Sequence, residues 1–388
     1  MRILTVCTSA HIFGAETITL KMLEGFKRAG HEQLAVTSTW TDGEFNKRLA
    51  DLGIPEIRMP FGSLSKRIRL QPMWWTANVI VRLPRLWMQW RRAVHRFRPD
   101  IILFTSWRHP LAVYPCPWPA PSFLIEHSNL ECTATRHTLY KLLGRTLRGF
   151  IAVSEFTGEH LKELGAPFAK IYVVRNGPFA ESELTGRSGE LSDDSSMAPA
   201  RLPRLGIVGQ ISPSKGHEVL LEAMRLLHRK NIQMEVSVFG SGNSHYIAEL
   251  CERIAGYGLE KFWKWRGYEL DRSKIYTDFD ICVVPSVWPE AFGMAAAEAG
   301  SYSLPVIASR SGGLREIVED GTSGWLVDPG DPLKLADRLQ WFIDNPKAAR
   351  QMGIAGRERV YRQFTQEKMV AAFEKLFHDA LANRSQAS

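Results

Sequence analysis

The stretch FDICVVPSVWPEAFGMAAAEAG, residues 279–300, joins an apolar run rich in β-branched residues, a turn with two prolines and a run of small residues. We expect the apolar run to form a buried strand and residues 292–300 to form a helix. Glu290 and Glu298 stand eight positions apart around the start of that helix. If the chain is helical from residue 290 onward, the two glutamates lie about 12 Å apart along the axis and within about 80° of one direction.

Strand–turn–helix patterns of this kind recur over nearly the whole chain. Continuous apolar strands between helices are typical of parallel sheets that are covered on both faces. The pattern restarts after residue 204, so we predict an α/β fold with two doubly wound, Rossmann-like domains in tandem. The main predicted strands are residues 2–7, 33–38, 100–104, 122–127 and 150–154, then 204–209, 234–240, 279–285 and 305–309.

The length of 388 residues is also typical of two domains. We place an N-terminal domain at residues 1–177 and a C-terminal domain at residues 205–365. Residues 178–204 are rich in Ser, Gly and acidic residues and lack a sustained apolar period, which indicates a linker. Residues 366–388 are predicted to form a C-terminal helix that can pack back on the N-terminal domain.

The composition is that of an ordinary globular protein, with 45% hydrophobic and 23% charged residues. The five cysteines are scattered without a C-x-x-C pair, so neither a zinc site nor a disulfide framework is expected. The N-terminal apolar run is too short for a signal peptide, and no long uncharged apolar stretch predicts a membrane span. We therefore expect a cytoplasmic protein. The net charge of +8 favours anionic partners.

Two predicted strand–helix turns have the character of anion sites. Gly14 follows the first strand, where the absence of a side chain lets the backbone approach a ligand closely. Lys215 and Gly216 stand at the head of a helix in the second domain, where an ammonium group and the helix dipole act together on an anion. A tight turn with a solvated lysine is an equally good interpretation of that motif alone. Neither turn has the P-loop or dinucleotide-binding pattern.

The spacing of Glu290 and Glu298 suits the two ends of a nucleoside diphosphate sugar, with sugar hydroxyls at one carboxylate and ribose hydroxyls at the other. The main-chain N–H groups between them form a helix N-terminus that suits sugar oxygens or a diphosphate. In the alternative interpretation, Glu290 only complements the helix dipole and Glu298 faces solvent. A further glycine turn at Gly312 and Gly313 favours the ligand-binding interpretation. The main-chain N–H groups at the start of the helix, between the two glutamates, are those of Phe292, Gly293 and Met294.

Taken together, the ordered motifs of the chain resemble those of the retaining family 4 glycosyltransferases, which have the GT-B fold. The resemblance rests on the E-x7-E pattern EAFGMAAAE (290–298) and on PVIASRSGGLREIVEDGTSGWLV (305–327). It extends to FGAE (13–16), RPDIILF (98–104) and IEHSN (125–129), and to VSEFTGEHL (153–161), KIYVVRNG (170–177) and GQISPSKG (209–216).

The resemblance implies two domains facing a central cleft and a role for each matching residue. Glu290 would hold the 3- and 4-hydroxyls of the transferred sugar, and Glu298 the ribose. Lys215, with the backbone at Gly14, would stabilise the departing diphosphate, and His127 would lie near the reacting centre. Three further residues match family loops near the nucleobase: Gly240, Gly267 and Tyr268.

The same resemblance implies a UDP- or GDP-sugar as donor and a glycan or lipid-linked acceptor, in cell-surface polysaccharide or glycolipid synthesis. It also implies retention of the anomeric configuration, with neither a metal nor a cofactor. Two departures stand out. Gln210 occupies a position where the family usually has arginine, and Phe13 precedes Gly14 where two glycines are common. An amide donates hydrogen bonds but brings no positive charge to the leaving group.

Two other functions are compatible with the pattern. A nucleotide-sugar epimerase can share this fold and would act without an acceptor. A non-catalytic protein that binds a sugar nucleotide within a polysaccharide assembly complex is a third possibility, which Gln210 leaves open. The presence of Glu290, Glu298 and Lys215 together favours transfer activity.

A basic, tryptophan-rich segment, residues 62–98, predicts contact with an anionic membrane surface. It contains Trp74, Trp75, Trp87 and Trp90 and no acidic residue. In the alternative interpretation its second half is a core helix that buries Trp87 and Trp90. No nucleic-acid-binding module is present, so we do not expect nucleic acid as a partner.

Overall fold

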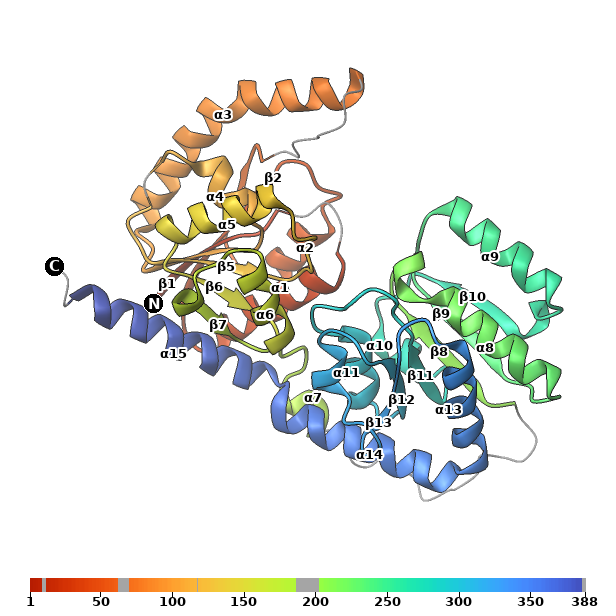
Figure 1. The fold of residues 1–388 in the computed structure, drawn as a ribbon. Helices are drawn as coiled ribbons and strands as arrows, with labels where there is room; N and C mark the ends of the chain where they lie inside the picture. The colour runs from red at the N-terminus through yellow and green to blue at the C-terminus, as the bar shows by residue number, and fades with distance from the viewer. Residues whose placement is uncertain (9–11, 62–69, 117, 186–201, 386–388) are drawn as a thin grey trace. The chain divides into compact units, whose positions relative to one another are not determined.

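The computed structural model describes residues 1–8, 12–61, 70–116, 118–185 and 202–385. It divides into two compact units. Unit 1 comprises Met1–Pro178 together with Gln366–Ser388, and unit 2 comprises Phe179–Thr365. In each unit, helices cover both faces of a parallel β-sheet (Figure 1).

The sheet of unit 1 has seven strands in the order β3-β2-β1-β4-β5-β6-β7. All its pairings are parallel, and Val6 of β1 lies opposite Val36 on one side and Phe104 on the other. The strand order reverses between β1 and β4. The strands are β1 (Arg2–Val6), β2 (Glu32–Ser38), β3 (Glu56–Met59), β4 (Ile101–Phe104), β5 (Ser122–Glu126), β6 (Gly149–Ala152) and β7 (Ile171–Val173).

Helices on the two faces of this sheet bury its alternating apolar side chains. On one face, Trp90 of α3 is fully buried and stacks on Phe104 of β4. On the other face, Phe26 of α1 packs edge-on against Phe373 of α15, so the last helix of the chain belongs to unit 1. The helices are α1 (Gly14–Arg28), α2 (Glu44–Asp51), α3 (Leu70–Phe97), α4 (Arg108–Val113), α5 (Ala134–Thr146), α6 (Glu155–Glu163) and α15 (Gln366–Ser385).

The sheet of unit 2 has six parallel strands in the order β10-β9-β8-β11-β12-β13. Its order reverses between β8 and β11. The strands are β8 (Arg204–Val208), β9 (Glu235–Phe239), β10 (Trp263–Gly267), β11 (Ile281–Val284), β12 (Val306–Ser309) and β13 (Gly324–Val327). The helices are α7 (Glu181–Thr185), α8 (His217–Arg229), α9 (Ser244–Gly256), α10 (Arg272–Tyr276), α11 (Met294–Ser301), α12 (Leu314–Ile317), α13 (Pro332–Asp344) and α14 (Pro346–Gln363).

Small side chains set the position of α11 in unit 2. Ala296, Ala297 and Gly300 are buried, and α11 packs closely on α14, where Val360 is also buried. Large side chains at these positions would hold the two helices further apart, because interiors are packed without voids. The small residues of the AAAEAG run therefore allow α11 to pack closely on α14.

The two doubly wound parallel sheets confirm the predicted α/β fold class. β13 pairs in parallel with β12 at the edge of the sheet. One local expectation was wrong. The helix after β11 begins at Met294 rather than at residue 290 or 292. Among the described helices, none is both long and apolar enough to span a membrane.

Candidate functional site

The turns that follow the strands of unit 2 meet at the carboxyl edge of its sheet. In doubly wound sheets, ligands bind outside this edge at the point where the strand order reverses, because helix N-termini on both sides direct N–H groups there. In unit 2 that point lies between β8 and β11. The turn after β8 carries Lys215 and the turn after β11 carries Glu290. These two predicted site residues are thus brought to the two sides of the switch point.

Lys215 and Glu290 form a direct ion pair. Nζ of Lys215 donates to Oε1 of Glu290 at 2.7 Å, and the hydroxyl of Ser286 donates to the same oxygen at 2.5 Å. The Glu290 side chain is 14% exposed and the Lys215 side chain 32%, so the pair is held at the surface of the sheet edge without being sealed from solvent. The carboxylate is fixed through one oxygen, and Lys215 keeps two further N–H donors that can turn toward an anion.

Backbone hydrogen bonds hold the two turns together. The carbonyl oxygen of Ser214, next to Lys215, accepts from the N–H of Val287 at 2.9 Å and from the N–H of Trp288 at 3.2 Å. The ion pair therefore does not depend on two mobile side chains finding each other. The main chain places the ammonium and carboxylate groups before any ligand binds, and such preorganisation lowers the cost of binding.

The glycine turn after β12 supports the backbone of Glu290 from the other side. The N–H of Gly313 donates to the carbonyl oxygen of Glu290 at 2.8 Å. A Cβ atom on Gly312 would lie 2.3 Å from that carbonyl oxygen, which no side chain can tolerate. The Gly312–Gly313 pair is thus explained by a close approach of two backbones.

The geometry that we derived from a continuous helix between the two glutamates is wrong. Glu290 lies in the turn before α11, and Gly293 caps that helix with a φ of 107°. A left-handed residue at this point interrupts the helical path, so the rise per residue does not apply across the turn. The N–H groups of Phe292, Gly293 and Met294 nevertheless belong to the entry of α11, and the Phe292 side chain is buried.

Glu298 lies in α11 and its carboxylate is bound by neighbours from α10. The Tyr276 hydroxyl donates to Oε2 at 2.7 Å, and the Arg272 guanidinium lies 3.1 Å from Oε1. The Glu298 side chain is 13% exposed, so it does not lie on a solvated helix face. These partners orient the carboxylate, and its remaining lone pairs are available to hydroxyl groups of a ligand.

The turns after β8, β9 and β10 form the adjoining part of the same edge. The N–H of Gly240 donates to the carbonyl oxygen of Gly267 at 2.7 Å, which ties the turns after β9 and β10 together. Gln210 is exposed, and Tyr268 has 53% of its surface exposed. An exposed amide and an exposed aromatic ring on rigid turns are suited to polar and stacking contacts with a ligand.

In unit 1, the predicted residues follow β1 and β5 at the carboxyl edge of the sheet. Gly14 is the first residue of α1 and is exposed. His127 directly follows β5 and is half-buried, and its Nε2 atom is shielded from solvent without a hydrogen-bond partner among the described residues. A shielded nitrogen of this kind is available to a ligand group.

The residue before His127 is a buried acid. Glu126 accepts hydrogen bonds from the Tyr140 hydroxyl and, at 2.7 Å, from the Ser128 hydroxyl. Burial raises the pKa of Glu126, and the hydrogen bonds oppose that shift. Burial also lowers the pKa of His127 to about 4, so its imidazole is neutral at physiological pH. A neutral imidazole offers one donor and one acceptor to a ligand.

Acid pH is expected to lower the stability of unit 2 around its site, because His217, the first residue of α8, is buried. Burial lowers its pKa to about 4, whereas an unfolded histidine has a pKa near 6.5. The unfolded state binds the proton more readily, so stability is full above pH 6.5 and declines toward pH 4. Hydrogen exchange of the α8 amides measures this decline. His217→Gln should reduce its slope by up to about 1.4 kcal/mol per pH unit, and His245→Gln, at an exposed histidine, should not.

Two family models match the chain. The model of glycosyltransferase family 4 matches residues 12–178, and the model of the glycosyl transferases group 1 matches residues 192–359. Together they extend over most of the chain and over the turns of both units described above. The chain belongs to glycosyltransferase family 4. This confirms the resemblance drawn from the motifs.

Individual relatives of this family 4 chain match it over shorter stretches. It is 32% identical over 204 residues to the D-inositol 3-phosphate glycosyltransferase of Corynebacterium diphtheriae, a match that covers 50% of this chain and 47% of the relative. The chain therefore spans about half the length, or less, of these curated relatives. Similarity of this extent supports membership of the family but does not identify the reaction, which has to be argued from the residues of the site.

Solved structures share the architecture over nearly the full chain. Anabaena HepE, solved in complex with UDP, superposes with a TM-score of 0.78 at 20% identity, covering 98% of this chain and 100% of that one. The lipopolysaccharide outer core galactosyltransferase WaaB gives a TM-score of 0.70 at 16% identity, covering 99% and 100%. At these identities the likeness shows the fold, which is the expected GT-B class.

The sequence motifs missed several residues of the site. Ser286 hydrogen-bonds Glu290, and Arg272 and Tyr276 hold Glu298. Ser286 lies four positions before Glu290, and its place in the turn after the predicted strand was a usable signal. Arg272 and Tyr276 gave no such signal in the sequence, because they contact Glu298 from a separate helix.

Proposed function

We propose that the chain transfers a sugar from a nucleoside diphosphate sugar to an acceptor, with retention of the anomeric configuration. The observation that supports this most directly is the Lys215–Glu290 pair at the switch point of unit 2, because it joins a cation to an oriented carboxylate at the ligand-binding edge. Family membership makes a nucleotide-sugar donor the natural ligand for this pair. UDP is the first nucleotide to test, because the neighbour HepE was solved with it.

In this proposal each charged group has one task. Glu290 accepts hydrogen bonds from hydroxyls of the transferred sugar, and Glu298 accepts them from the ribose. Lys215 and the N–H groups at the start of α11 face the diphosphate, whose negative charge grows as the glycosidic bond breaks. Preorganised donors aimed at developing charge are the largest contribution in many enzymes. With this source of positive potential, we propose that transfer needs neither a divalent metal nor a cofactor.

The proposed acceptor is a glycan or a lipid-linked glycan of cell-surface polysaccharide or glycolipid synthesis. Support comes from WaaB, a structural neighbour whose name places it in the lipopolysaccharide outer core. His127 is the residue of unit 1 that we propose for contact with the reacting groups, since its shielded Nε2 has no partner among the described residues.

The test begins with thermal shift of the purified chain against UDP- and GDP-sugars, because a ligand at 100 times its Kd stabilises by about 2.7 kcal/mol. The stabilising donor is then incubated with a panel of glycan and lipid-linked acceptors, with and without EDTA. NMR of the product gives its anomeric configuration. Transfer with an inverted configuration would overturn the retaining mechanism.

The same experiment separates the other two functions. An epimerase would convert the sugar nucleotide without any acceptor, and its product would form at the same rate when the acceptor is left out. A non-catalytic binding partner would be stabilised by a donor and would give no turnover with any acceptor. Either outcome would replace the proposal.

Gln210→Arg is expected to raise kcat by about tenfold. The exposed amide follows β8 at the edge that carries Lys215, and a charge-assisted hydrogen bond there would be stronger than a neutral one by roughly 1–1.5 kcal/mol. The comparison is kcat with the preferred donor, and Gln210→Lys is the control for charge without the planar donor group. An unchanged or lower kcat in both variants would mean that Gln210 does not face the diphosphate.

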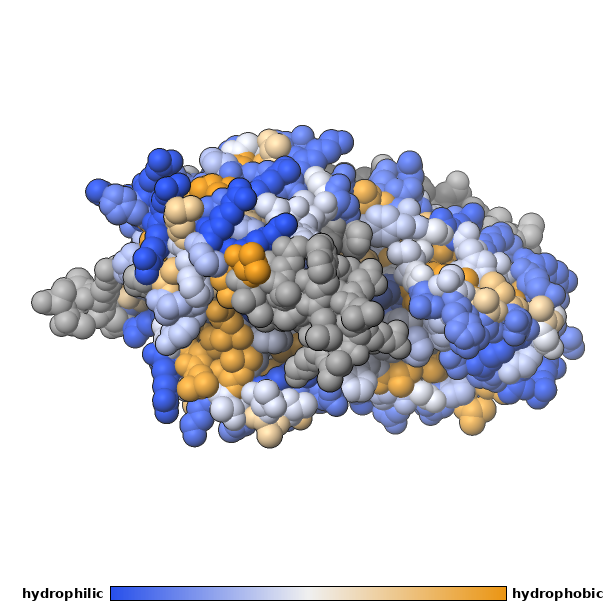
Figure 2. Space-filling model, turned by 90° about the horizontal axis from the view of Figure 1, so that it is seen from above, coloured by the Kyte–Doolittle hydropathy of each residue, from blue (hydrophilic) through white to orange (hydrophobic). Residues whose placement is uncertain are grey.

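We also propose that α3 contacts an anionic membrane surface. Five arginines between residues 82 and 96 of this helix are exposed: Arg82, Arg85, Arg91, Arg92 and Arg96. Hydrophilic side chains gather on the face of unit 1 that is seen in Figure 2, with hydrophobic groups between them. The expected contribution of Trp87 and Trp90 was wrong. Trp90 is fully buried, and Trp87 is partly buried with its Nε1 donating to the carbonyl oxygen of Ala112. Residues 62–69 and the side chains of Trp74 and Trp75 lie outside what is described.

Sedimentation with vesicles of anionic lipid tests this surface. Binding should fall about tenfold or more when Arg82, Arg85 and Arg92 are all changed to glutamate, because each basic residue near such a surface contributes about 1 kcal/mol. The control reverses three exposed lysines of unit 2, Lys261, Lys334 and Lys347, and changes the net charge equally. Equal loss in both triple variants would show an effect of net charge rather than of α3.

A further inference from the structure

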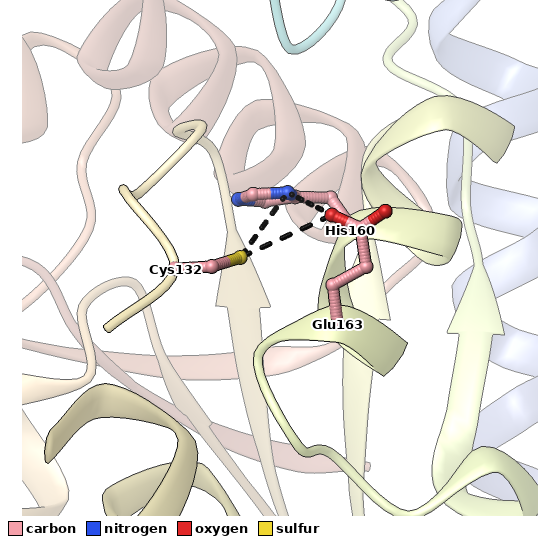
Figure 3. Close-up of side chains that lie close together, drawn as sticks. All are labelled: Cys132, His160 and Glu163. Atoms are coloured by element: carbon pink, nitrogen blue, oxygen red, sulfur yellow. Dashed lines mark hydrogen bonds and ion pairs between the residues drawn. The ribbon is translucent and has the colours of Figure 1, made fainter. Parts of the chain in front are cut away.

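Three side chains of kinds that bind metal ions, those of Cys132, His160 and Glu163, converge in unit 1 (Figure 3). Cys132 lies in the loop between β5 and α5, and His160 and Glu163 lie in the last turns of α6. The Cys132 sulfur is 4.0 Å from Nδ1 of His160 and 3.9 Å from Oε2 of Glu163. Nδ1 of His160 is 3.3 Å from the same Glu163 oxygen. Three different kinds of ligand atom therefore face one another across a single point.

The surroundings of His160 fix which nitrogen faces that point. Nε2 of its ring lies 2.6 Å from the carbonyl oxygen of Leu130. A carbonyl only accepts, so Nε2 carries a hydrogen. In the neutral ring Nδ1 then presents its lone pair to Cys132 and Glu163. The ring also stacks on Phe156 with an interplanar angle of 8°. An imidazole whose second nitrogen donates to a backbone carbonyl is the usual arrangement of a metal-ligating histidine.

The distances agree with the size of a zinc-class ion. The circle through the three ligand atoms has a radius of about 2.2 Å, obtained from their separations. Zinc bonds to thiolate sulfur at about 2.3 Å, and to imidazole nitrogen and carboxylate oxygen at about 2.0–2.2 Å. A contraction of a few tenths of an ångström would move the ion out of the plane and give three corners of a tetrahedron. The exposed side chains of Cys132 and Glu163 leave the fourth corner open to solvent.

A nucleophilic cysteine explains the same residues less well. In a catalytic triad the histidine uses one nitrogen for the nucleophile and the other for the acid that orients it. Here Cys132 and Glu163 share Nδ1, and the second nitrogen faces the backbone. Partial burial and the Glu163 carboxylate also raise the pKa of the Cys132 thiol, which disfavours a free thiolate. A bound cation would reverse that effect by stabilising the thiolate.

We propose that Cys132, His160 and Glu163 bind one divalent zinc-class cation, with a fourth position open to water or an external ligand. Binding converts the Cys132 thiol to a thiolate and releases its proton to solvent. The ion connects the loop that follows β5 to α6. That loop begins with His127, so occupancy of the site would restrict the backbone next to a residue proposed for transfer.

The test titrates the reduced, tag-free full chain with Zn²⁺ in competition with a chromophoric chelator, and then with Co²⁺. We expect one high-affinity site per chain and a sulfur-to-cobalt charge-transfer band in the near ultraviolet. Affinity should rise with pH, because the thiol must lose its proton. Cys132→Ser and Glu163→Gln should each weaken binding by about 100-fold or more, since even the loss of an outer hydrogen bond costs 10- to 100-fold.

Cys251→Ser is the matched control, because Cys251 is also an exposed free cysteine and lies in unit 2. It should leave both the affinity and the cobalt band unchanged. Circular dichroism of each variant checks that the fold is retained. The proposal is overturned if no site binds Zn²⁺ with a Kd below about 1 μM, or if Cys132→Ser and Cys251→Ser lose binding equally. The assay does not use the transferase reaction, so its outcome is independent of the proposed function.

Discussion

Replacement of Lys215 by methionine is expected to lower kcat for sugar transfer by about 10²- to 10³-fold. Removal of one preorganised donor from developing negative charge has a cost of this size. Methionine keeps the length of the side chain and removes only the charge and the N–H donors. The change in KM should be smaller, because the charge on the diphosphate is greatest in the transition state and interactions specific to that state act on kcat.

Lys264→Met is the matched control for this measurement. Lys264 forms an ion pair with Glu235 at 2.5 Å between neighbouring strands of the same sheet, and its side chain is 40% exposed. Exposed ion pairs contribute about 0–1 kcal/mol to stability, so kcat of this variant should stay within about twofold of the parent. Equal losses in both variants would show that Lys215 acts on the stability of unit 2 rather than on the reaction.

Glu290→Gln extends the argument to the partner carboxylate. Glutamine keeps the shape of the side chain but weakens its hydrogen bonds to sugar hydroxyls, so activity should again fall strongly. The effects of the two substitutions should not add, because residues that act on the same step as a unit lose their joint contribution together. A double variant whose loss equals the product of the two single losses would mean that Lys215 and Glu290 act independently, despite their 2.7 Å contact.

The central strands of both sheets could be predicted from the sequence, whereas the edge strands could not. β8 and β11 are buried on both faces, so their apolar runs stand out against the helices. β3 and β10 lie at the sheet edges, where charged residues such as Arg58 and Lys264 replace part of the apolar pattern. An edge strand needs to bury less of its surface, so the sequence signal that marks it is weaker.

Within the site, the sequence located the strand-end turns but not the contacts between them. Lys215 and Glu290 were each placed at a turn, because glycine and proline mark where a strand ends. Their ion pair depends on β8 and β11 being neighbours, which follows from the strand order and not from local pattern. The Cys132, His160 and Glu163 cluster was missed for the same reason, since Cys132 lies 28 and 31 residues before the other two and only the fold brings it to them.

Gly216→Ala is expected to destabilise unit 2 by about 3–5 kcal/mol and to abolish donor binding. Gly216 has a φ of 74°, and an alanine there costs about 1–2 kcal/mol for backbone conformation alone. In addition, its Cβ atom would lie 1.9 Å from the carbonyl oxygen of Pro285. Pro285 directly follows β11, so relief of the clash must separate the turn that carries Lys215 from the turn that carries Glu290.

Gly258→Ala isolates the backbone cost from the clash. Gly258 has a φ of 67°, and a Cβ atom there meets nothing within 4 Å. This variant should lose about 1–2 kcal/mol and bind the donor as the parent does. For a unit of this size 1 kcal/mol corresponds to about 2–4 °C, so Gly216→Ala should lower the melting temperature of unit 2 by about 6–20 °C, and Gly258→Ala by about 2–8 °C. Similar melting temperatures for the two variants would mean that the turns after β8 and β11 can separate without cost, and the preorganised ion pair would lose its structural basis.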